Sequence, residues 1–161
     1  MKTYPAPWSP LLKAVSAVAT VICLAIVFMH PVWGGKIPLP VIILSEVIPL
    51  ALLAGCALFI VRGFVITPDA ILVKRLLWNT RLPRAGLQSV TYSPALTRGS
   101  VRTFGNGGLY SFTGWYWNQE LGRYRAFVTD HANIVVLRYP ESTMVLSPGD
   151  PEAFVKAVTE K

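Results

Sequence analysis

Arginines recur in the second half of the chain and are the residues best suited to bind a ligand. Arg98 and Arg102 stand close together, and Arg123 and Arg125 are separated by one residue, so in a strand the second pair shares one face. From Arg62 onward, twelve lysines and arginines face seven acids. Such a surplus attracts anionic headgroups, at about 1 kcal/mol for each well-placed cation. The four arginines are candidate headgroup contacts, and an ordinary solvated face is the alternative.

Three glycines, Gly105, Gly107 and Gly108, follow closely. A phosphate-binding GxGxxG loop would need another glycine where Tyr110 stands, and neither a Lys-Ser nor a Lys-Thr pair follows. The segment is therefore interpreted as a bulged loop that leads into a strand. We expect these glycines to share a contact surface with Arg98 and the other arginines.

Two long apolar stretches, Leu11 to Met29 and Pro40 to Val61, precede these residues. A helix rises about 1.5 Å per residue, so roughly 20 apolar residues cross a hydrocarbon core of about 30 Å. The stretches therefore predict two membrane-spanning helices. A cleaved signal peptide is the alternative for the first one, but its apolar run is longer than a signal peptide requires and no small-residue cleavage pattern follows Phe28.

The connection from His30 to Leu39 contains two prolines and two glycines, which predicts a tight turn between antiparallel helices. Basic residues flank the outer ends of the hairpin, with Lys2 and Lys13 before it and Arg62 after it. We therefore expect a multi-pass protein of the cell membrane with both termini in the cytoplasm. Residues 1–10 would form a cytoplasmic tail, 11–61 the helical hairpin (11–29 and 40–61) and 62–161 a separate domain.

Glu46 lies inside the second apolar stretch, where an ionised carboxylate is costly. It is expected to be protonated, bonded to Ser45 or to the first helix, or directed at a partner subunit. Pro49 is expected to bend the helix and release a carbonyl that could serve as its partner. Glu46 is therefore a candidate intramembrane polar site, either functional or structural.

No catalytic or metal-binding set is recognisable. The two histidines are expected on opposite sides of the membrane, and Cys23 and Cys56 lie in the apolar stretches. No nucleophile and base stand in a known arrangement. We expect no metal, no cofactor and no enzymatic activity. Aromatic residues between Tyr110 and Trp117 could stack on bases, but such residues more often form a β core, so we expect no nucleic-acid partner.

Beyond Arg62 the pattern changes to short runs of β-branched and aromatic residues separated by turn residues. This pattern predicts an antiparallel β-barrel or sandwich. The expected strands lie near Phe64 to Thr67, Ala70 to Trp78, Leu87 to Tyr92, Val101 to Phe104, Tyr110 to Trp117, Arg123 to Thr129, Asn133 to Arg138 and Thr143 to Leu146.

The sequence near the end of the chain predicts a helix. Asp150 can accept bonds from the first helical amides, and Pro151 suits the first helical position. We expect a helix from Pro151 to about Glu160, with Phe154 and Val158 on one face, that caps one end of the β domain. The fold class is therefore α+β, with two transmembrane helices before the β domain.

Three segments of this domain resemble bacterial proteins with a pleckstrin-homology-like (PH-like) domain. These are the runs Gly105 to Tyr116, Leu121 to Tyr124 and Ser147 to Phe154, and the similarity extends from roughly Gly63 to the end. The resemblance implies a PH-like fold. In those bacterial proteins, such a domain often follows two membrane helices. It also implies a module that recognises lipid, peptide or protein.

The resemblance does not extend to the basic motif that binds phosphoinositides in eukaryotic relatives. In this chain Lys74 and Arg75 are followed by Leu76 and Leu77. The tryptophan common in the last helix of those relatives is also replaced, by Phe154. Phosphoinositides are therefore not the expected ligand.

Two functions fit these observations. The first is a membrane-anchored, non-enzymatic PH-like module that binds membrane lipid or another membrane or cytoplasmic protein. The second is a subunit of a transport or envelope complex that acts through its transmembrane helices, where Glu46 would contact a partner.

Overall fold

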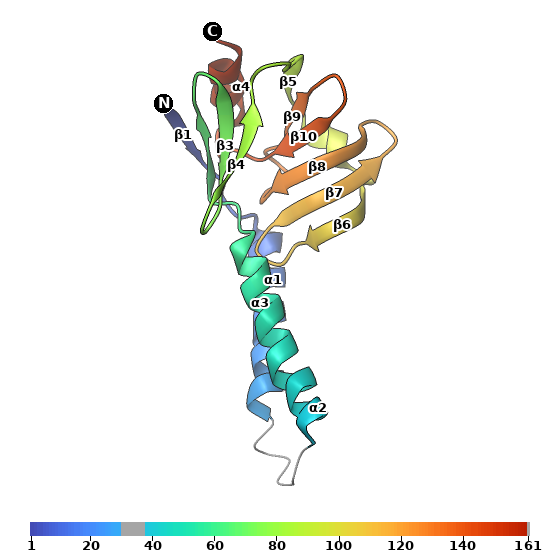
Figure 1. Cartoon of the computed structure of the whole chain (residues 1–161). Coiled ribbons are helices and arrows are strands. Elements are labelled where there is room, and N and C mark those ends of the chain that lie inside the picture. The colour runs from blue at the N-terminus through green and yellow to red at the C-terminus, as the bar shows by residue number, and fades with distance from the viewer. Residues whose placement is uncertain (30–37, 161) are drawn as a thin grey trace.

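A pair of long helices projects from one end of a β-sandwich, as Figure 1 shows for the computed structural model of the chain. The structure describes residues 1–29 and 38–160. Helix α1 spans Pro10–Met29, and the second rod consists of α2 (Leu39–Ile42), a π-helical turn η2 (Ile43–Val47) and α3 (Ile48–Leu58). Most of the connection expected to form a tight turn, residues 30–37, lies outside the described residues.

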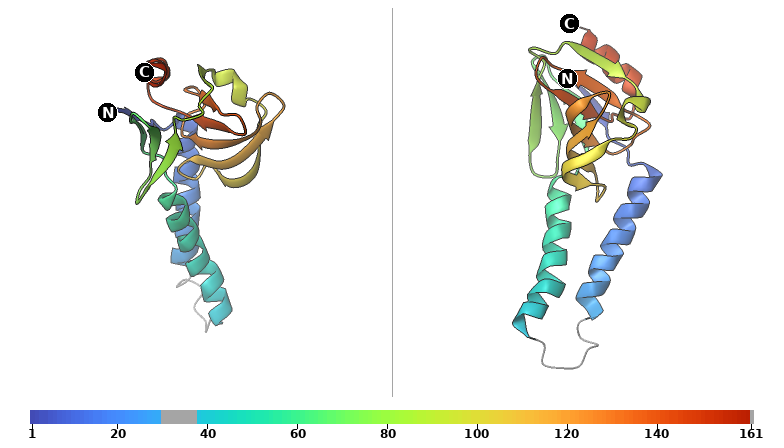
Figure 2. Two further views of the ribbon diagram at one scale, coloured as in Figure 1. Left: turned by 45° about the horizontal axis from the view of Figure 1, so that its top comes forward. Right: turned by 90° about the vertical axis from the view of Figure 1, so that its right-hand side faces the viewer.

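Both rods are long and apolar enough to cross a membrane. Only 11% of the apolar segment Pro10–Phe28 and 6% of Leu39–Leu58 is buried within the protein. The right-hand view of Figure 2 shows the two rods separate from the sandwich over most of their length. A helix in the core of a soluble protein would instead be mostly buried.

The π-helical turn in the second rod lies directly before Ile48 and Pro49. Proline has no N–H, so the carbonyl of Ser45 loses its α-helical donor. The hydroxyl of Ser45 donates to the carbonyl of Val41 at 2.7 Å. The disturbance expected from Pro49 therefore takes the form of a widened turn, and Glu46 lies within it.

One sheet has four antiparallel strands in chain order: β1 (Lys2–Pro5), β2 (Gly63–Ile66), β3 (Ala70–Lys74) and β4 (Asn79–Pro83). Strand β1 precedes α1 and pairs with β2, so that Thr3 lies opposite Val65. The sequence predicted only a tail for residues 1–10, and β1 was missed. The predicted single strand Ala70 to Trp78 is also corrected, because the chain turns after Lys74 and returns as β4.

The other sheet has six strands in the order β5, β9, β10, β8, β7, β6. Its strands are β5 (Ser89–Tyr92), β6 (Val101–Gly107), β7 (Phe112–Asn118), β8 (Gly122–Val128), β9 (Val135–Arg138) and β10 (Thr143–Leu146), and a 3₁₀ turn η3 (Pro94–Thr97) follows β5. Strands β8 and β10 run parallel, so the expected all-antiparallel arrangement is corrected at this pair.

The core lies between the sheets and under the last helix, α4 (Pro151–Thr159). Phe154 of α4 is fully buried and packs its ring edgewise against Tyr4 of β1 and Phe64 of β2. The carboxylate of Asp150 accepts a bond from the N–H of Ala153 at 3.0 Å, a cap that stabilises a helix by about 1 kcal/mol. The predicted cap and capping helix are confirmed.

Candidate functional site

The turn between β6 and β7 is fixed against α1. The hydroxyl of Ser16 accepts a bond from the N–H of Tyr110 at 2.9 Å and donates to the carbonyl of Gly108 at 3.4 Å. The hydroxyls of Thr20 and Tyr110 are 2.9 Å apart. Ser16 is only 3% exposed. The turn that contains Gly107 and Gly108 thus joins the sandwich to α1, an apolar helix long enough to cross a membrane, and is not an open loop.

Asn106 satisfies the polar groups of the same turn. Its side-chain oxygen accepts bonds from the N–H groups of Gly108 and Leu109, at 3.2 and 3.0 Å, and its side-chain nitrogen donates to the carbonyl of Leu109. Its own carbonyl accepts from the hydroxyl of Tyr116 at 2.8 Å. A turn whose polar groups are internally bonded can leave water at low cost.

The turn between β3 and β4 lies beside the top of α3 in all views of Figures 1 and 2. The ring of Trp78 packs edgewise on Phe59 with centroids 5.3 Å apart, which fixes this position. Leu76 and Leu77 are exposed, Leu77 to 74%. The shallow depression around this turn is lined by cations, apolar residues and one amide, without an acid: Arg62, Lys74, Arg75, Leu76, Leu77, Trp78 and Asn79.

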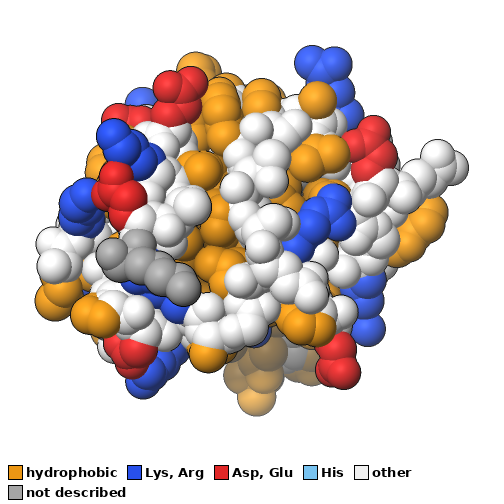
Figure 3. All heavy atoms as spheres, turned by 90° about the horizontal axis from the view of Figure 1, so that it is seen from above, with side chains coloured by type: hydrophobic (Ala, Val, Ile, Leu, Met, Phe, Trp, Pro, Cys, Tyr) orange, Lys and Arg blue, Asp and Glu red, His pale blue; other side chains and the backbone are white. Residues whose placement is uncertain are grey.

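The opposite end of the domain carries charges of both signs. Figure 3, which looks down on that end, shows acidic and basic side chains interspersed around an apolar centre. Glu160 of this region is within 4.0 Å of both Lys2 and Lys156. Within the described parts of the chain, the cations at the end that faces the helices have no ion-pair partner and lie beside exposed apolar residues.

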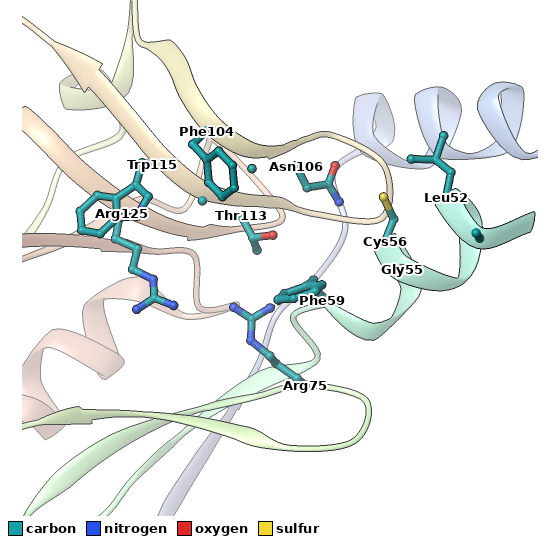
Figure 4. Close-up of a pocket in the computed structure, with 13 residues that line it drawn as sticks. Leu52, Gly55, Cys56, Phe59, Arg75, Phe104, Asn106, Thr113, Trp115 and Arg125 are labelled. Atoms are coloured by element: carbon teal, nitrogen blue, oxygen red, sulfur yellow. The ribbon is translucent and has the colours of Figure 1, made fainter. Parts of the chain in front are cut away.

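A cavity of about 500 Å³ separates α3 from the six-stranded sheet (Figure 4). One wall is helical and comprises Ala51, Leu52, Gly55, Cys56 and Phe59, and the other contains Arg75, Phe104, Gly105, Asn106, Thr113, Gly114, Trp115 and Arg125. Its volume lies within the usual range for small-molecule sites.

Two facing glycines lie in the sheet wall of this cavity. Gly105 of β6 pairs with Gly114 of β7, and both have positive φ, 110° and 137°. A Cβ on Gly114 would collide with the carbonyl oxygen of Phe104, so no other residue fits the close approach of these strands. Phe104, directly before Gly105, lines the cavity, and its side chain is 74% exposed.

Arg75 forms the polar end of the cavity although it is only 6% exposed. Its Nη1 donates to the carbonyl of Phe59 at 2.6 Å, and its Nε donates to the hydroxyl of Thr80 at 3.0 Å. The first bond satisfies an orphan carbonyl just beyond the carboxyl end of α3, where a cation is favoured. Burial, with a smaller effect of Arg125, lowers the pKa of Arg75 to about 10, so it remains charged at neutral pH.

Arg125 approaches Arg75 from the other sheet. The two guanidinium carbons lie 5.3 and 5.0 Å from the ring centre of Phe127, Arg75 giving the longer distance. Figure 4 shows the two guanidinium groups extended toward each other. Within residues 1–29 and 38–160, neither has a carboxylate within ion-pair distance. Two neighbouring cations without a carboxylate partner give this end of the cavity a positive potential, which favours an anion.

The structure brings only two of the predicted contact residues, Gly105 and Arg125, to this cavity. Arg102 and Gly107 line a separate cavity of about 280 Å³ with Tyr116 and His131, where the Arg102 guanidinium covers Gly107. Partial burial lowers the pKa of His131, against the opposing effect of Asp130.

The remaining predicted contacts are elsewhere. Arg123 stacks over Trp115 at 4.4 Å, Arg98 follows the turn η3 in an exposed position, and Gly108 is bonded to α1. Glu46 is half-buried in the π-helical turn, in the part of the second rod distant from the sandwich. The predicted residues therefore do not form a single site.

Arg75 and the apolar turn that follows it were missed as site residues. A signal was present, since Arg75 precedes three consecutive apolar residues in a region expected to be a strand. Among the described residues, no three His, Cys, Asp or Glu side chains come together as metal ligands.

Comparison with known proteins agrees with the fold. Residues 62–161 match the family model described as a bacterial PH domain, while β1 lies outside that match. No curated protein and no solved structure is detectably similar to the chain. The match covers more than half of the chain, and the sandwich with its carboxy-terminal helix has the PH-like architecture expected from the sequence. The chain belongs to the bacterial PH domain family.

Proposed function

We propose that this chain is a non-enzymatic membrane protein whose PH domain is seated on the cytoplasmic face of the cell membrane and binds anionic lipid there. One observation carries the proposal: the end of the domain beside the helices presents exposed Leu76, Leu77 and Trp78 among cations, without an acid. Apolar side chains next to basic ones are typical of surfaces that enter the interface of an anionic membrane.

The depth of the β6–β7 turn supports this placement. Ser16 lies about 9 Å and Thr20 about 15 Å along α1 from Pro10, at about 1.5 Å per residue. The turn bonded to them therefore lies beside the apolar part of α1. When α1 crosses a membrane, the turn is at the depth of the headgroups or below. Its internally bonded polar groups suit that environment.

The position of β1 supports a hairpin topology. Since β1 precedes α1 and pairs with β2 after α3, a membrane crossed by both helices would have both ends of the helical pair on one side. Lys2 and Lys13 near the first end and Arg62 and Lys74 after the second favour the cytoplasmic side. A signal peptide removed together with β1 would leave the edge of β2 unpaired.

The experiment uses the full chain in nanodiscs of phosphatidylcholine alone or mixed with phosphatidylglycerol. Hydrogen exchange of the Leu76 and Leu77 amides should be slower in the anionic nanodiscs, whereas the distant turn 139–142 should exchange equally in both. Replacing Arg62 and Lys74 by Gln removes about 1 kcal/mol of attraction per cation, which should reduce the protection roughly tenfold or more. Equal exchange in both nanodiscs and in detergent would contradict the proposal.

The alternative function, a subunit of a membrane complex, is favoured by the π-helical turn that contains Glu46, because such turns often mark functional positions. Glu46→Gln tests it by cross-linking in membranes. A changed cross-linking pattern with unchanged protection of Leu77 supports the complex, and an unchanged pattern removes its main support.

A further inference from the structure

The cavity between α3 and the six-stranded sheet has an apolar part and a cationic part. Its helical wall, with Leu52 and Gly55, belongs to the apolar segment that is long enough to cross a membrane. Its far end contains Arg75 and Arg125 (Figure 4). Leu52 precedes Phe59 by seven residues, so the apolar wall extends about 10 Å along the helix. A molecule that fills the cavity must be apolar at one end and anionic at the other.

The environment of the two arginines favours an anionic group at this end of the cavity. Arg75 is buried, its Nη1 and Nε are occupied by Phe59 and Thr80, and no carboxylate neutralises its charge within the described residues. Arg125 is half-buried beside the same ring, that of Phe127. Two neighbouring cations repel each other, and an anion held between them would offset that repulsion. A phosphate accepts several such bonds at once, in the geometry that guanidinium groups favour.

We propose that this cavity binds one anionic phospholipid, with the headgroup phosphate between Arg75 and Arg125 and an acyl chain along Leu52 and Gly55 of α3. This inference rests on the proposed seating of the domain on the membrane, because only a seated domain opens the cavity to lipid. The site would hold an individual lipid, and the β3–β4 turn would contact the surface as a whole. The domain would thereby recognise lipid at the junction with its own membrane helix.

A free phosphate ion has the same anionic chemistry and is the other possible source. The apolar wall distinguishes the two sources, since inorganic phosphate gains nothing from Leu52 or from the exposed ring of Phe104. Dependence of binding on an acyl chain is therefore part of the proposal.

Gly55 offers a steric test that does not disturb the fold. A Cβ at Gly55 would have nothing within 4 Å, so a larger side chain can begin there without a collision at its first atom. Gly55→Leu should block the apolar half of the site. Ala54→Leu is the matched control, because Ala54 is exposed on the same helix and does not line the cavity. Arg125→Gln removes the anionic contact, and Arg138→Gln removes one exposed charge elsewhere.

The experiment is native mass spectrometry of the full chain in detergent with phosphatidylglycerol, phosphatidylcholine or inorganic phosphate. We expect one phosphatidylglycerol per chain, with at least about tenfold weaker binding in Gly55→Leu and Arg125→Gln and no change in the two controls. Equal binding of phosphatidylcholine, equal binding by all variants, or phosphate binding that competes with the lipid at similar concentrations would each overturn the assignment. If one of these results is found while Leu77 is still protected in anionic nanodiscs, the lipid site is refuted and the proposed seating of the domain on the membrane stands.

Discussion

The hydroxyl of Ser16 in α1 and the backbone N–H of Tyr110 in the β6–β7 turn are joined by a hydrogen bond of 2.9 Å. Tyr110 has φ of 66°, a left-handed conformation that costs a non-glycine residue about 1 kcal/mol or more. The ring of Trp8 lies 6.1 Å from the ring of Tyr110. The residues around α1 therefore hold a strained turn, and through it the sandwich, in one place relative to the helix.

Replacing Ser16 by Ala should destabilise the chain by about 1–3 kcal/mol, because the part-buried N–H of Tyr110 would lose its acceptor. Thermal unfolding in detergent measures this loss. Ser45→Ala is the control, since the Ser45 hydroxyl bonds to carbonyls one turn earlier in its own helical rod, and the variant should change stability little. Equal effects of the two variants would show that the bond to Tyr110 does not hold the turn.

Tyr4 tests whether β1 is part of the domain. Its ring packs edgewise on Phe154 at 5.2 Å, and its hydroxyl donates to the carbonyl of Ala153 at 3.0 Å. Tyr4→Ala in the full chain should cost about 3 kcal/mol of unfolding free energy. Tyr92→Ala, which removes an exposed ring, should cost much less. A negligible effect of Tyr4→Ala would mean that β1 is dispensable.

Gly114→Ala should destabilise the chain more than Gly86→Ala. Both glycines have positive φ, 137° and 80°, which costs an alanine roughly 1–2 kcal/mol. At Gly86 a Cβ would have nothing within 4 Å, whereas at Gly114 it would meet the backbone of Phe104. The collision adds about 1–3 kcal/mol. Denaturant unfolding of the two variants measures the difference, and equal costs would argue against the close approach of β6 and β7.

Much of the fold could be predicted from the sequence because its signals are local. The two apolar stretches, the helix start at Asp150 and most strands depend on residue type and spacing within a few positions. Strand β1 was missed because Lys2–Pro5 is short and its pairing partner, Gly63–Ile66, lies beyond both helices. No local pattern reports such a distant pairing.

The β3–β4 turn was missed for a different physical reason. Turns are recognised by residues that favour contact with water, yet here the residues that follow Arg75 are Leu76, Leu77 and Trp78. In the proposed seating of the domain, this turn faces the membrane and does not need polar residues. The same absence of a turn signal merged β3 with the turn and concealed β4.

The candidate site was only partly predictable because it depends on packing between the sheets. Arg125 and Gly105 were expected to contact a ligand, but Arg75 was noted only as part of an unmatched motif. Its burial follows from the approach of Phe127 on the other sheet, which sequence spacing does not reveal. Arg98 and Arg123, selected for charge and spacing, are exposed and do not line the cavity.

The depth of Leu77 tests the central claim, that the domain is seated on the membrane, most directly. A spin label at Leu77→Cys, in a full chain with Cys23 and Cys56 replaced by Ser, can be compared with a label at Glu141→Cys on the distant β9–β10 turn. In anionic liposomes the label at position 77 should be accessible to oxygen and shielded from a water-soluble nickel reagent, and the label at position 141 should show the reverse. A label at position 77 as accessible to nickel as the one at position 141 would contradict the account.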